Sequence, residues 1–240
     1  MSDIVHDGSS MIDRLRSDDG GDGGVGPPID LITVSREFGA GGSVLAHIAG
    51  NELQWPVLDR DLLRLVAERL RLEPHHVEAV DEQPPGLLTR LIASALLMAP
   101  PELPTEVQTD RLHPDSVAAA ARAAILAAAE SPPLIVVGHA SQCLFHHRPG
   151  TMHIRLVAPL ALRLQRVCAR MPCDSAKAVA ETRRMDQARA AYVRRHHQAD
   201  WRDPLLYDME FNTGRVTIEE AARMVVSVVT ARNGVRALSD

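Results

Sequence analysis

A buried strand, a glycine-rich turn and a helix follow one another within residues 31–49, and this unit constrains the fold most. Residues 31–34 (LITV) form a continuous apolar run of the kind found in buried strands. Gly39, Gly41 and Gly42 then predict a tight turn, and the apolar spacing of residues 43–49 predicts a helix. A strand that leads through a turn into a helix is the repeating unit of α/β proteins. We therefore expect an α/β domain.

The same alternation continues along the chain. Further strands are predicted at residues 55–58, 134–138, 153–158 and 208–212, and helices at 62–72, 117–129, 159–170, 175–195 and 217–232. The two central apolar runs suit strands that are buried on both faces, which are typical of a parallel sheet with right-handed crossovers. Thr217 and Glu220 have the spacing of a capping box at the start of the last helix.

The predicted domain occupies residues 29–232 and carries several appendages. Residues 1–28 are acidic and glycine-rich, with too little apolar surface to offset the entropy of ordering, so we predict a flexible tail. Residues 74–115 contain apolar helix-like pieces interrupted by prolines and are predicted to form a helical insertion or mobile cover. Residues 233–240 are expected to form a second flexible tail.

Composition narrows the classes of function. The formal net charge of −5 argues against a broad nucleic-acid surface, and no apolar run reaches the length needed to span a bilayer, so the cytoplasm is the expected location. The three cysteines are expected to be free thiols, since they form no CxxC pair or even framework. Arginines concentrate in residues 163–202, which favours a small polyanion such as a phosphate compound, with a solvated helical face as the alternative.

The glycine-rich turn partly matches the phosphate-loop pattern GxxxxGK[ST]. In the window 36–43 (REFGAGGS), Gly41 and Ser43 occupy pattern positions, whereas Arg36 stands at the first glycine and Gly42 at the lysine. Backbone amides at the start of a helix form a cradle for an anion. By spacing alone, a simple strand-to-helix turn is an equal alternative.

Several segments together resemble the cytidylate kinase-like family, relatives of nucleoside monophosphate kinases. The resemblance is carried by residues 32–43 (ITVSREFGAGGS), Asp59-Arg60, Val137-Gly138, Tyr207-Asp208 and Asn212-Thr213. It covers residues 30 to about 230 and implies a P-loop kinase-type parallel sheet flanked by helices, with a helical insertion and a lid. Members share the loop without lysine, so Gly42 departs from the general pattern and not from this family.

The resemblance also implies a nucleotide site and an acceptor site. ATP is expected on the loop and near the last strand, at Gly39, Ala40, Gly41, Gly42, Ser43, Asn212 and Thr213. Mg²⁺ is expected near the Ser43 hydroxyl. A monophosphate acceptor is expected near Asp59, Arg60 and His139, where many members carry arginine in place of His139. Asp59, at the end of a strand, suits a role in orienting the acceptor or accepting its proton.

Phosphoryl transfer needs positive charge around the migrating group, so another cation must replace the missing lysine. Arg36 is one candidate. The other is the lid-like region 171–203, whose arginines Arg184 and Arg189 are candidates together with Asp186, which shares a helix face with Arg189. A solvent-facing helix with ordinary ion pairs is the alternative for this region. Two further arginines, Arg163 and Arg166, are expected to be solvated at the surface, with a position that faces phosphate as the alternative.

The favoured interpretation is an enzyme, an ATP-dependent nucleoside monophosphate kinase-like phosphotransferase. It would act on a small-molecule nucleotide, without a nucleic-acid or membrane partner, and a homo-oligomer is compatible with it. The alternative is a catalytically weak nucleotide-binding regulatory module, favoured by the missing lysine and by His139. A kinase for a non-nucleotide metabolite is the third hypothesis.

Overall fold

The computed structural model describes residues 26–59, 114–170 and 174–236, and within them five parallel strands form one sheet. The strands are β1 (Leu31–Arg36), β2 (Val57–Leu58), β3 (Leu134–Val137), β4 (Thr151–Val157) and β5 (Met209–Asn212). Their order is β2-β3-β1-β4-β5, and every pair is parallel. The predicted α/β fold with a parallel sheet is therefore confirmed. Because β1 is central, the glycine turn after it lies in the middle of the sheet's carboxyl edge.

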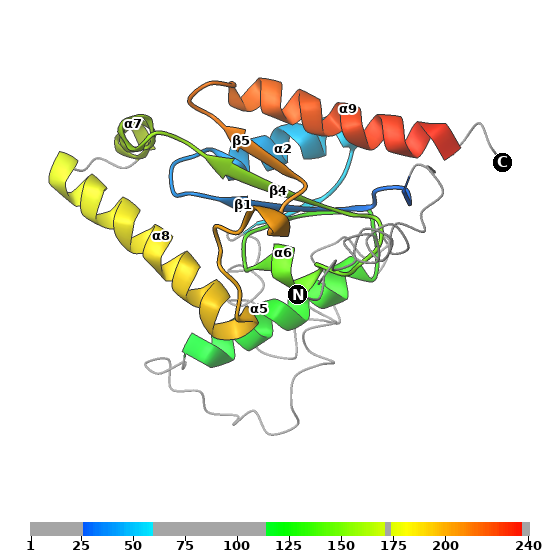
Figure 1. Cartoon of the computed structure of the whole chain (residues 1–240), viewed down its shortest axis with the longest axis horizontal. Helices are drawn as coiled ribbons and strands as arrows, with labels where there is room; N and C mark the ends of the chain where they lie inside the picture. The colour runs from blue at the N-terminus through cyan, green and yellow to red at the C-terminus, as the bar shows by residue number, and fades with distance from the viewer. Residues whose placement is uncertain (1–25, 60–113, 171–173, 237–240) are drawn as a thin grey trace, which may run out of the picture.

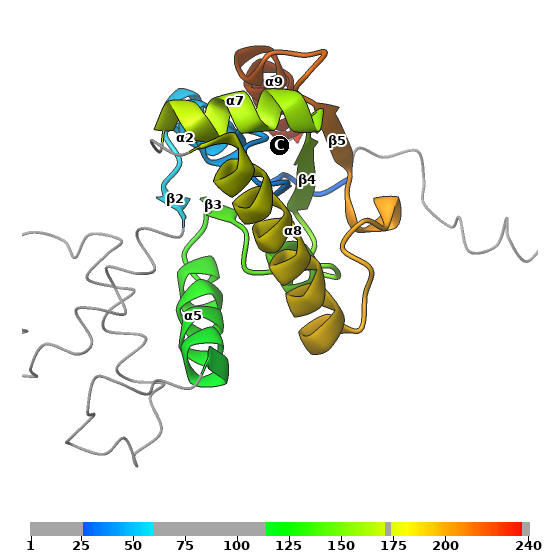
Figure 2. The same cartoon turned by 90° about the vertical axis from the view of Figure 1, so that its left-hand side faces the viewer.

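Helices cover both faces of the sheet (Figure 1). The long helices α2 (Gly42–Leu53) and α9 (Ile218–Arg236) lie together on one face, above the sheet in Figure 1. On the other side lie α5 (Pro114–Ala129), the short α6 (Ser141–Leu144) and α8 (Ser175–His197). Helix α7 (Leu160–Arg170) packs against α8 close to the carboxyl end of β4 (Figure 2). The molecule is thus a three-layer α/β domain.

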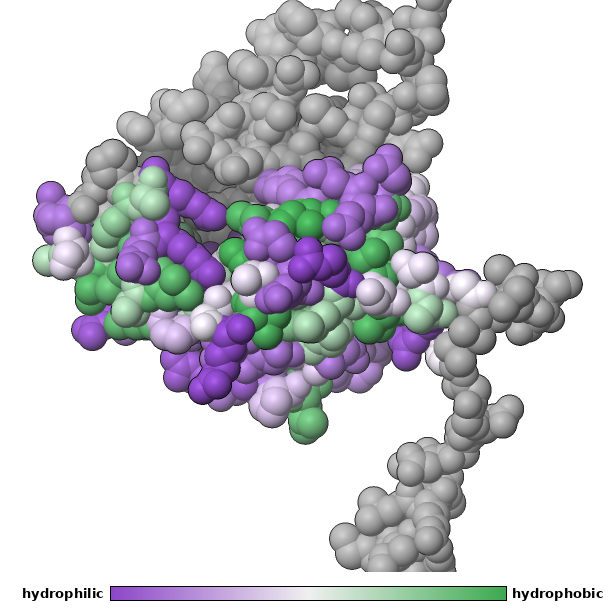
Figure 3. Space-filling model, turned by 90° about the horizontal axis from the view of Figure 1, so that it is seen from above, coloured by the Kyte–Doolittle hydropathy of each residue, from purple (hydrophilic) through white to green (hydrophobic). Residues whose placement is uncertain are grey.

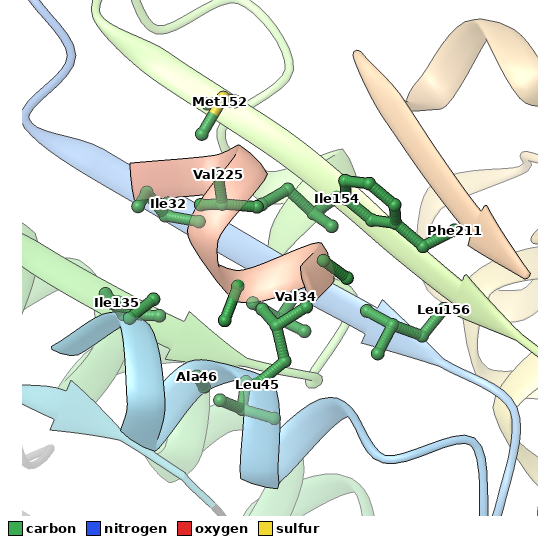
Figure 4. Close-up of a cluster of buried hydrophobic side chains, with 14 of the residues drawn as sticks. Ile32, Val34, Leu45, Ala46, Ile135, Met152, Ile154, Leu156, Phe211 and Val225 are labelled. Carbon is green, nitrogen blue, oxygen red and sulfur yellow. The ribbon is translucent and has the colours of Figure 1, made fainter. Parts of the chain in front are cut away.

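The face toward α2 and α9 is entirely apolar at its centre (Figure 4). Alternate residues of β1 and β4 point to it, so Ile32, Val34, Ile154 and Leu156 are each at most 1% exposed. They pack against side chains of the two helices, including Leu45 of α2 and Val225 of α9. Full burial of side chains of this size contributes about 1.5–3 kcal/mol each. This cluster holds β1, and hence the turn after it, in place.

The opposite face is apolar beneath α5 but polar nearer the carboxyl ends of β1 and β4. Thr33, Ser35, His153 and Arg155 point to this side and are all buried, with no more than 6% exposure. Trp201, which follows α8, packs over Ser35 and donates a hydrogen bond from its Nε1 to Ser35 Oγ at 2.8 Å. Polar residues therefore alternate with the apolar core positions along the same two strands.

The described helices and strands mostly agree with those predicted from sequence. The Thr217 capping box is confirmed, since Thr217 Oγ1 accepts from the Glu220 amide and the Glu220 carboxylate accepts from the Thr217 amide. Helix α5 begins at Pro114, three residues before its predicted start. Helix α6 and the short 3₁₀ helix η2 (Pro204–Leu206) were not expected. The predicted tail 1–28, the insertion 74–115 and the helix 62–72 lie wholly or largely outside the described residues. Residues 233–236, the first half of the predicted second tail, continue helix α9.

The outer surface of α9 combines charged residues with a few exposed apolar ones. Figure 3 looks onto this surface from above, where apolar patches lie among hydrophilic side chains. Met224 is 47% exposed and Val228 is 39% exposed. No helix in the described part of the chain is long and apolar enough to cross a membrane.

Candidate phosphate-binding site

The turn between β1 and α2, residues 37–41, is here called the glycine loop, and two of its glycines are required by its geometry. Gly39 and Gly41 have φ angles of 82° and 98°, in the left-handed region that glycine adopts without strain. A Cβ atom on Gly39 would lie 2.8 Å from the carbonyl oxygen of Arg163. The close approach of α7 to the loop therefore also depends on glycine at this position.

Three arginines from α7 and α8 hold the carbonyl groups of this region. Their hydrogen bonds run from Arg189 Nη1 to Arg36 O (2.6 Å), from Arg163 Nη1 to Phe38 O (3.2 Å) and from Arg166 Nη1 to Ala40 O (3.4 Å). The Arg189 guanidinium also lies 5.8 Å from the centre of the Phe38 ring. Cations on the carbonyl side fix the orientation of the peptide groups. The amides of Gly39 and Gly41, which share peptide groups with the Phe38 and Ala40 carbonyls, are thereby held in a defined direction.

The amides of Gly39, Gly41, Gly42 and Ser43 have no backbone hydrogen-bond partner among the described residues. They follow the central strand directly and lie at the start of the twelve-residue helix α2, where the helix dipole favours negative charge. Unpartnered amides at a helix N-terminus form an anion-binding site. The geometry thus agrees with a phosphate cradle on the residues that the sequence indicated.

Asp186 of α8 ties the loop to α7. One carboxylate oxygen accepts from the Phe38 amide at 2.7 Å, and the other lies 2.6 Å from Arg163 Nη1. Both side chains of this ion pair are shielded, with exposures of 14% for Asp186 and 10% for Arg163. Glu37 in the loop adds a second carboxylate, since it accepts from the Ala158 amide at 3.1 Å. Helix α8 is therefore in direct contact with the glycine loop.

The end of β5 supports the loop from another side. Thr213 is buried, and its hydroxyl donates to Ala40 O at 2.9 Å while accepting from Arg166 Nη1, also at 2.9 Å. The neighbouring Asn212 is exposed, and its side chain closes a local turn by accepting from the Gly214 amide. Thr213 thus supports the loop, whereas contact of either residue with a nucleotide stays a prediction.

The side chain of Arg36 runs along the carboxyl edge of the sheet. Its stem lies over the first residue of α2, because a Cβ on Gly42 would be 2.8 Å from both Cβ and Cγ of Arg36. Its guanidinium covers Gly138, the residue after β3, where an added Cβ would overlap Nη1. Arg36 therefore bridges the start of α2 and the turn that follows β3.

The predicted acceptor residues lie at the ends of β2 and β3. Asp59 is mostly buried, and its carboxylate lies 3.1 Å from Nε2 of His47, four residues along α2 from Ser43. Ser43 and His47 share a helix face, so Asp59 is linked to the face that carries Ser43. His139 has a φ of 55° in an unusual run of left-handed residues. Arg60 lies outside the described residues.

The side chains of the remaining charged candidates on α7 and α8 have partners within the protein. Arg184 is 66% exposed and donates twice to Glu181 at 2.7 Å, which raises its pKa, so it forms the surface ion pair of the alternative interpretation. Asp186 bonds the Phe38 amide and Arg163 in place of the expected pair with Arg189. Contrary to expectation, Arg163 is buried and Arg166 is half-buried, and burial lowers the pKa of Arg166. The sequence contained one signal for these contacts: two arginines spaced i, i+3 lie on one face of the helix that directly follows β4.

Comparisons with known proteins identify the family. No curated protein matches the sequence. An uncharacterized protein from Eubacterium ventriosum is 18% identical over 84% of this chain and 98% of its own, with a TM-score of 0.61, which indicates a shared fold. A shikimate kinase from Bacteroides thetaiotaomicron is 13% identical over 85% of this chain and 99% of its own, with a TM-score of 0.48. The model of the cytidylate kinase-like family matches residues 31–215, which contain all five described strands and the glycine loop, so the chain belongs to the cytidylate kinase-like family.

Proposed function

We propose that this protein is a kinase that binds ATP on the glycine loop and transfers its γ-phosphoryl group to a small phosphorylated acceptor, with nucleoside monophosphates as the first candidates. Family membership supports the general class of phosphotransferase. The observation that carries the proposal is the set of four unpartnered amides at the start of α2, in a loop region where three arginines hold the carbonyls of Arg36, Phe38 and Ala40. Such a cradle suits the phosphate chain of a nucleotide.

The cradle is preorganised, which matters for a reaction whose charge moves between phosphate oxygens. Four arginine side chains lie against the loop region, in a protein of net charge −5. The Phe38 amide donates to Asp186, and Arg163 and Arg166 donate to loop carbonyls, so the protein's own side chains fix the loop and little reorganisation is needed when phosphate binds. Local positive charge in an acidic chain favours a compact anion over an extended one.

The chain also offers oxygen atoms for a magnesium ion. Mg²⁺ is usually held by one or two protein oxygens together with phosphates and water, and the Ser43 hydroxyl in the first turn of α2 fits that pattern. The Asp59 carboxylate, linked through His47 to the same helix face, is a second oxygen donor near this position. A bound Mg²⁺ would neutralise charge that develops on the phosphate oxygens.

The acceptor site that we propose lies at the carboxyl edge beyond β2 and β3. Ligands of open parallel sheets bind at this edge, and Asp59 and His139 both lie there. In the transfer, an acceptor oxygen forms the new bond to the γ-phosphorus as the bond to the β,γ-bridging oxygen breaks, and ADP leaves. The contribution of Asp59, His139 and Arg60 would be to hold the acceptor in line with that bond.

A nucleotide-binding module with little turnover is the second candidate. Two observations favour it: Gly42 stands where the phosphate-loop lysine belongs, and Arg184 is engaged with Glu181 on the surface. Such a module would bind ATP through the same amides. Turnover therefore distinguishes the two candidates, and binding does not.

The test combines turnover and binding on one sample. ATP consumption with Mg²⁺ is measured across a panel of nucleoside monophosphates and small hydroxyl-bearing metabolites, beside a calorimetric titration with ATP. Asp186→Asn is compared with the exposed control Glu130→Gln, which also removes one charge. We expect Asp186→Asn to weaken ATP binding about tenfold, because the buried Arg163 loses the nearer of its two carboxylate partners, and the control to leave it unchanged.

Each outcome has a defined meaning. Turnover with one nucleoside monophosphate supports the kinase and names its acceptor, and turnover with a metabolite keeps the kinase but changes the acceptor class. Tight ATP binding without turnover on any acceptor supports the regulatory module. An absence of ATP binding by the folded wild-type protein would overturn the proposed phosphate cradle.

A further inference from the structure

The segment that spans the glycine loop, residues 36–43, departs from the phosphate-loop pattern GxxxxGK[ST] at two positions, and the two residues concerned are in contact. Residues 36–43 read REFGAGGS, with arginine at the first glycine of the pattern and glycine at the lysine. A Cβ atom on Gly42 would lie 2.8 Å from Cβ and Cγ and 3.2 Å from Cδ of Arg36. The stem of the arginine therefore fills the space in which a lysine side chain would begin.

The close contact alone explains why position 42 has no side chain. Gly42 lies in the first turn of α2, and its φ is not among the positive values that exclude other residues. Backbone geometry thus permits lysine at this position, whereas Arg36 does not. If Arg36 were glycine, as in the general pattern, this obstacle would be gone. The two departures are parts of one arrangement.

The charged end of Arg36 lies at the turn that follows β3, past the start of α2. Its stem crosses Gly42, whose own amide belongs to the cradle, and the guanidinium lies against Gly138 at the end of β3. Glycine at position 138 is needed both for this contact and for its φ of 84°. Arg36 thus places a permanent positive charge between the loop and the turn after β3, the side on which the acceptor is proposed to bind.

The other two candidate cations lie at other positions around the loop and α8. Arg189 donates to the carbonyl oxygen of Arg36 at 2.6 Å and lies near the Phe38 ring, so it contacts the carbonyl side of the loop. Arg184 is paired with Glu181 on the exposed surface of α8. Neither lies against the first residue of α2, as Arg36 does.

We propose that the phosphate-contacting cation of this site has moved from position 42 to position 36, and that Arg36 and glycine at 42 form one interdependent replacement for the phosphate-loop lysine. The inference rests on the proposed function for the nature of the ligand. The inference also has a steric half: Arg36 restricts which side chain fits at position 42, and this restriction does not require a ligand. A guanidinium also offers several donors in a fixed plane, so it suits contact with two phosphate groups at once.

The test restores the general pattern in two steps. Arg36→Gly removes the cation, Gly42→Lys adds a lysine beside Arg36, and the double variant reads GEFGAGKS, a full match to the pattern. ATP affinity with Mg²⁺ is measured by calorimetry at one ionic strength, with the exposed Arg202→Gly as a control for loss of one positive charge. We expect Arg36→Gly to weaken ATP binding at least tenfold, Arg202→Gly to leave it unchanged, and the double variant to bind within about threefold of wild type.

The steric half is tested by thermal stability without ligand. Gly42→Ala is made in the wild-type and Arg36→Gly backgrounds. We expect it to lower Tm by about 3–6 °C in the first, where its Cβ meets Arg36, and to leave or raise Tm in the second, because alanine is the better helix former. An equal effect of Gly42→Ala in both backgrounds would overturn the interdependence.

The affinity results separate this inference from the proposed function. Two results would overturn the role of Arg36 while leaving the phosphate cradle intact. One is that Arg36→Gly binds ATP as tightly as the wild-type protein. The other is that the double variant loses as much ATP-binding free energy as the two single variants lose together. A folded wild-type protein that binds neither ATP nor tripolyphosphate would overturn the proposed function and, with it, the phosphate role of Arg36. The stability measurement would still decide the steric half in that case.

Discussion

The two faces of the central strands differ sharply although the same two strands, β1 and β4, form both. Toward α2 and α9, Ile32, Val34, Ile154 and Leu156 form a continuous apolar core. Toward α6 and α8, the alternate positions carry polar or charged side chains that are equally buried. The first face is stabilised by burial of apolar area, whereas the second depends on specific partners for each polar group.

Buried polar side chains of the second face have partners in the segment that follows α8 and in β5. Arg155 pairs with Glu210 at 2.6 Å, and its guanidinium carbon lies 5.4 Å from the Trp201 ring and 5.6 Å from the Tyr207 ring. Burial raises the pKa of Tyr207 to about 12, so the phenol stays protonated, and it donates to the Trp201 carbonyl. These contacts fix the chain after α8, the same helix that supplies Asp186 and Arg189 to the loop. The polar face thus connects α8 to the sheet.

The largest effect should come from the apolar face. Ile154→Ala removes a fully buried side chain at the centre of the core and leaves a cavity among rigid neighbours. We expect the free energy of unfolding to fall by about 3 kcal/mol, measured by urea denaturation. A loss below about 1 kcal/mol would show that this face is not the main source of stability.

A smaller effect is expected for the charged pair on the polar face. Arg155→Met keeps much of the buried stem but removes the partner of Glu210 and the contacts with both aromatic rings. Because the Glu210 side chain is 43% exposed, water can solvate its carboxylate, and we expect a loss of about 1–2 kcal/mol in the same measurement. A loss equal to that of Ile154→Ala would remove the distinction between the faces.

The smallest effect that we expect on the polar face is a pH dependence of stability caused by His153. Burial lowers the pKa of His153, against the opposing attraction of Asp208, and its Nδ1 lies 2.7 Å from Thr33 Oγ1. Since the unfolded chain has the higher histidine pKa, near 6.5, it binds more protons, so stability should decrease as the pH falls below that value. His153→Asn should reduce this decrease between pH 7.5 and 5.5. Identical pH profiles of Tm would contradict the assignment.

Local patterns were sufficient for most of the fold. Apolar runs predicted β1, β3 and β4, because strands buried on both faces need continuous apolar sequence, and helical spacing predicted α2, α7, α8 and α9. Helix α6 was missed because it follows three consecutive left-handed residues, of which only Gly138 is a glycine, so no turn signal was visible. The boundaries differ by a few residues at most where both are defined.

The site was predictable in its backbone and less so in its side chains. The unpartnered amides of the loop lie where the glycine pattern placed them, because positive φ values and close approaches require glycine. The roles of Arg163 and Arg166 could not be predicted. Helical spacing in the sequence shows which residues share a face of the helix, but it does not show which other segment that face contacts. The same limit applies to Asp186, whose partners lie 23 and 148 residues away in the chain.

The sequence by itself determined the parallel α/β architecture, the position of the glycine loop and the absence of a lysine at position 42, because these depend on local composition and spacing. Only the tertiary structure decided which arginines support the loop, and that Arg36 occupies the space beside Gly42. Such contacts arise when strand order and helix packing bring distant segments together, and no local pattern in the sequence encodes them.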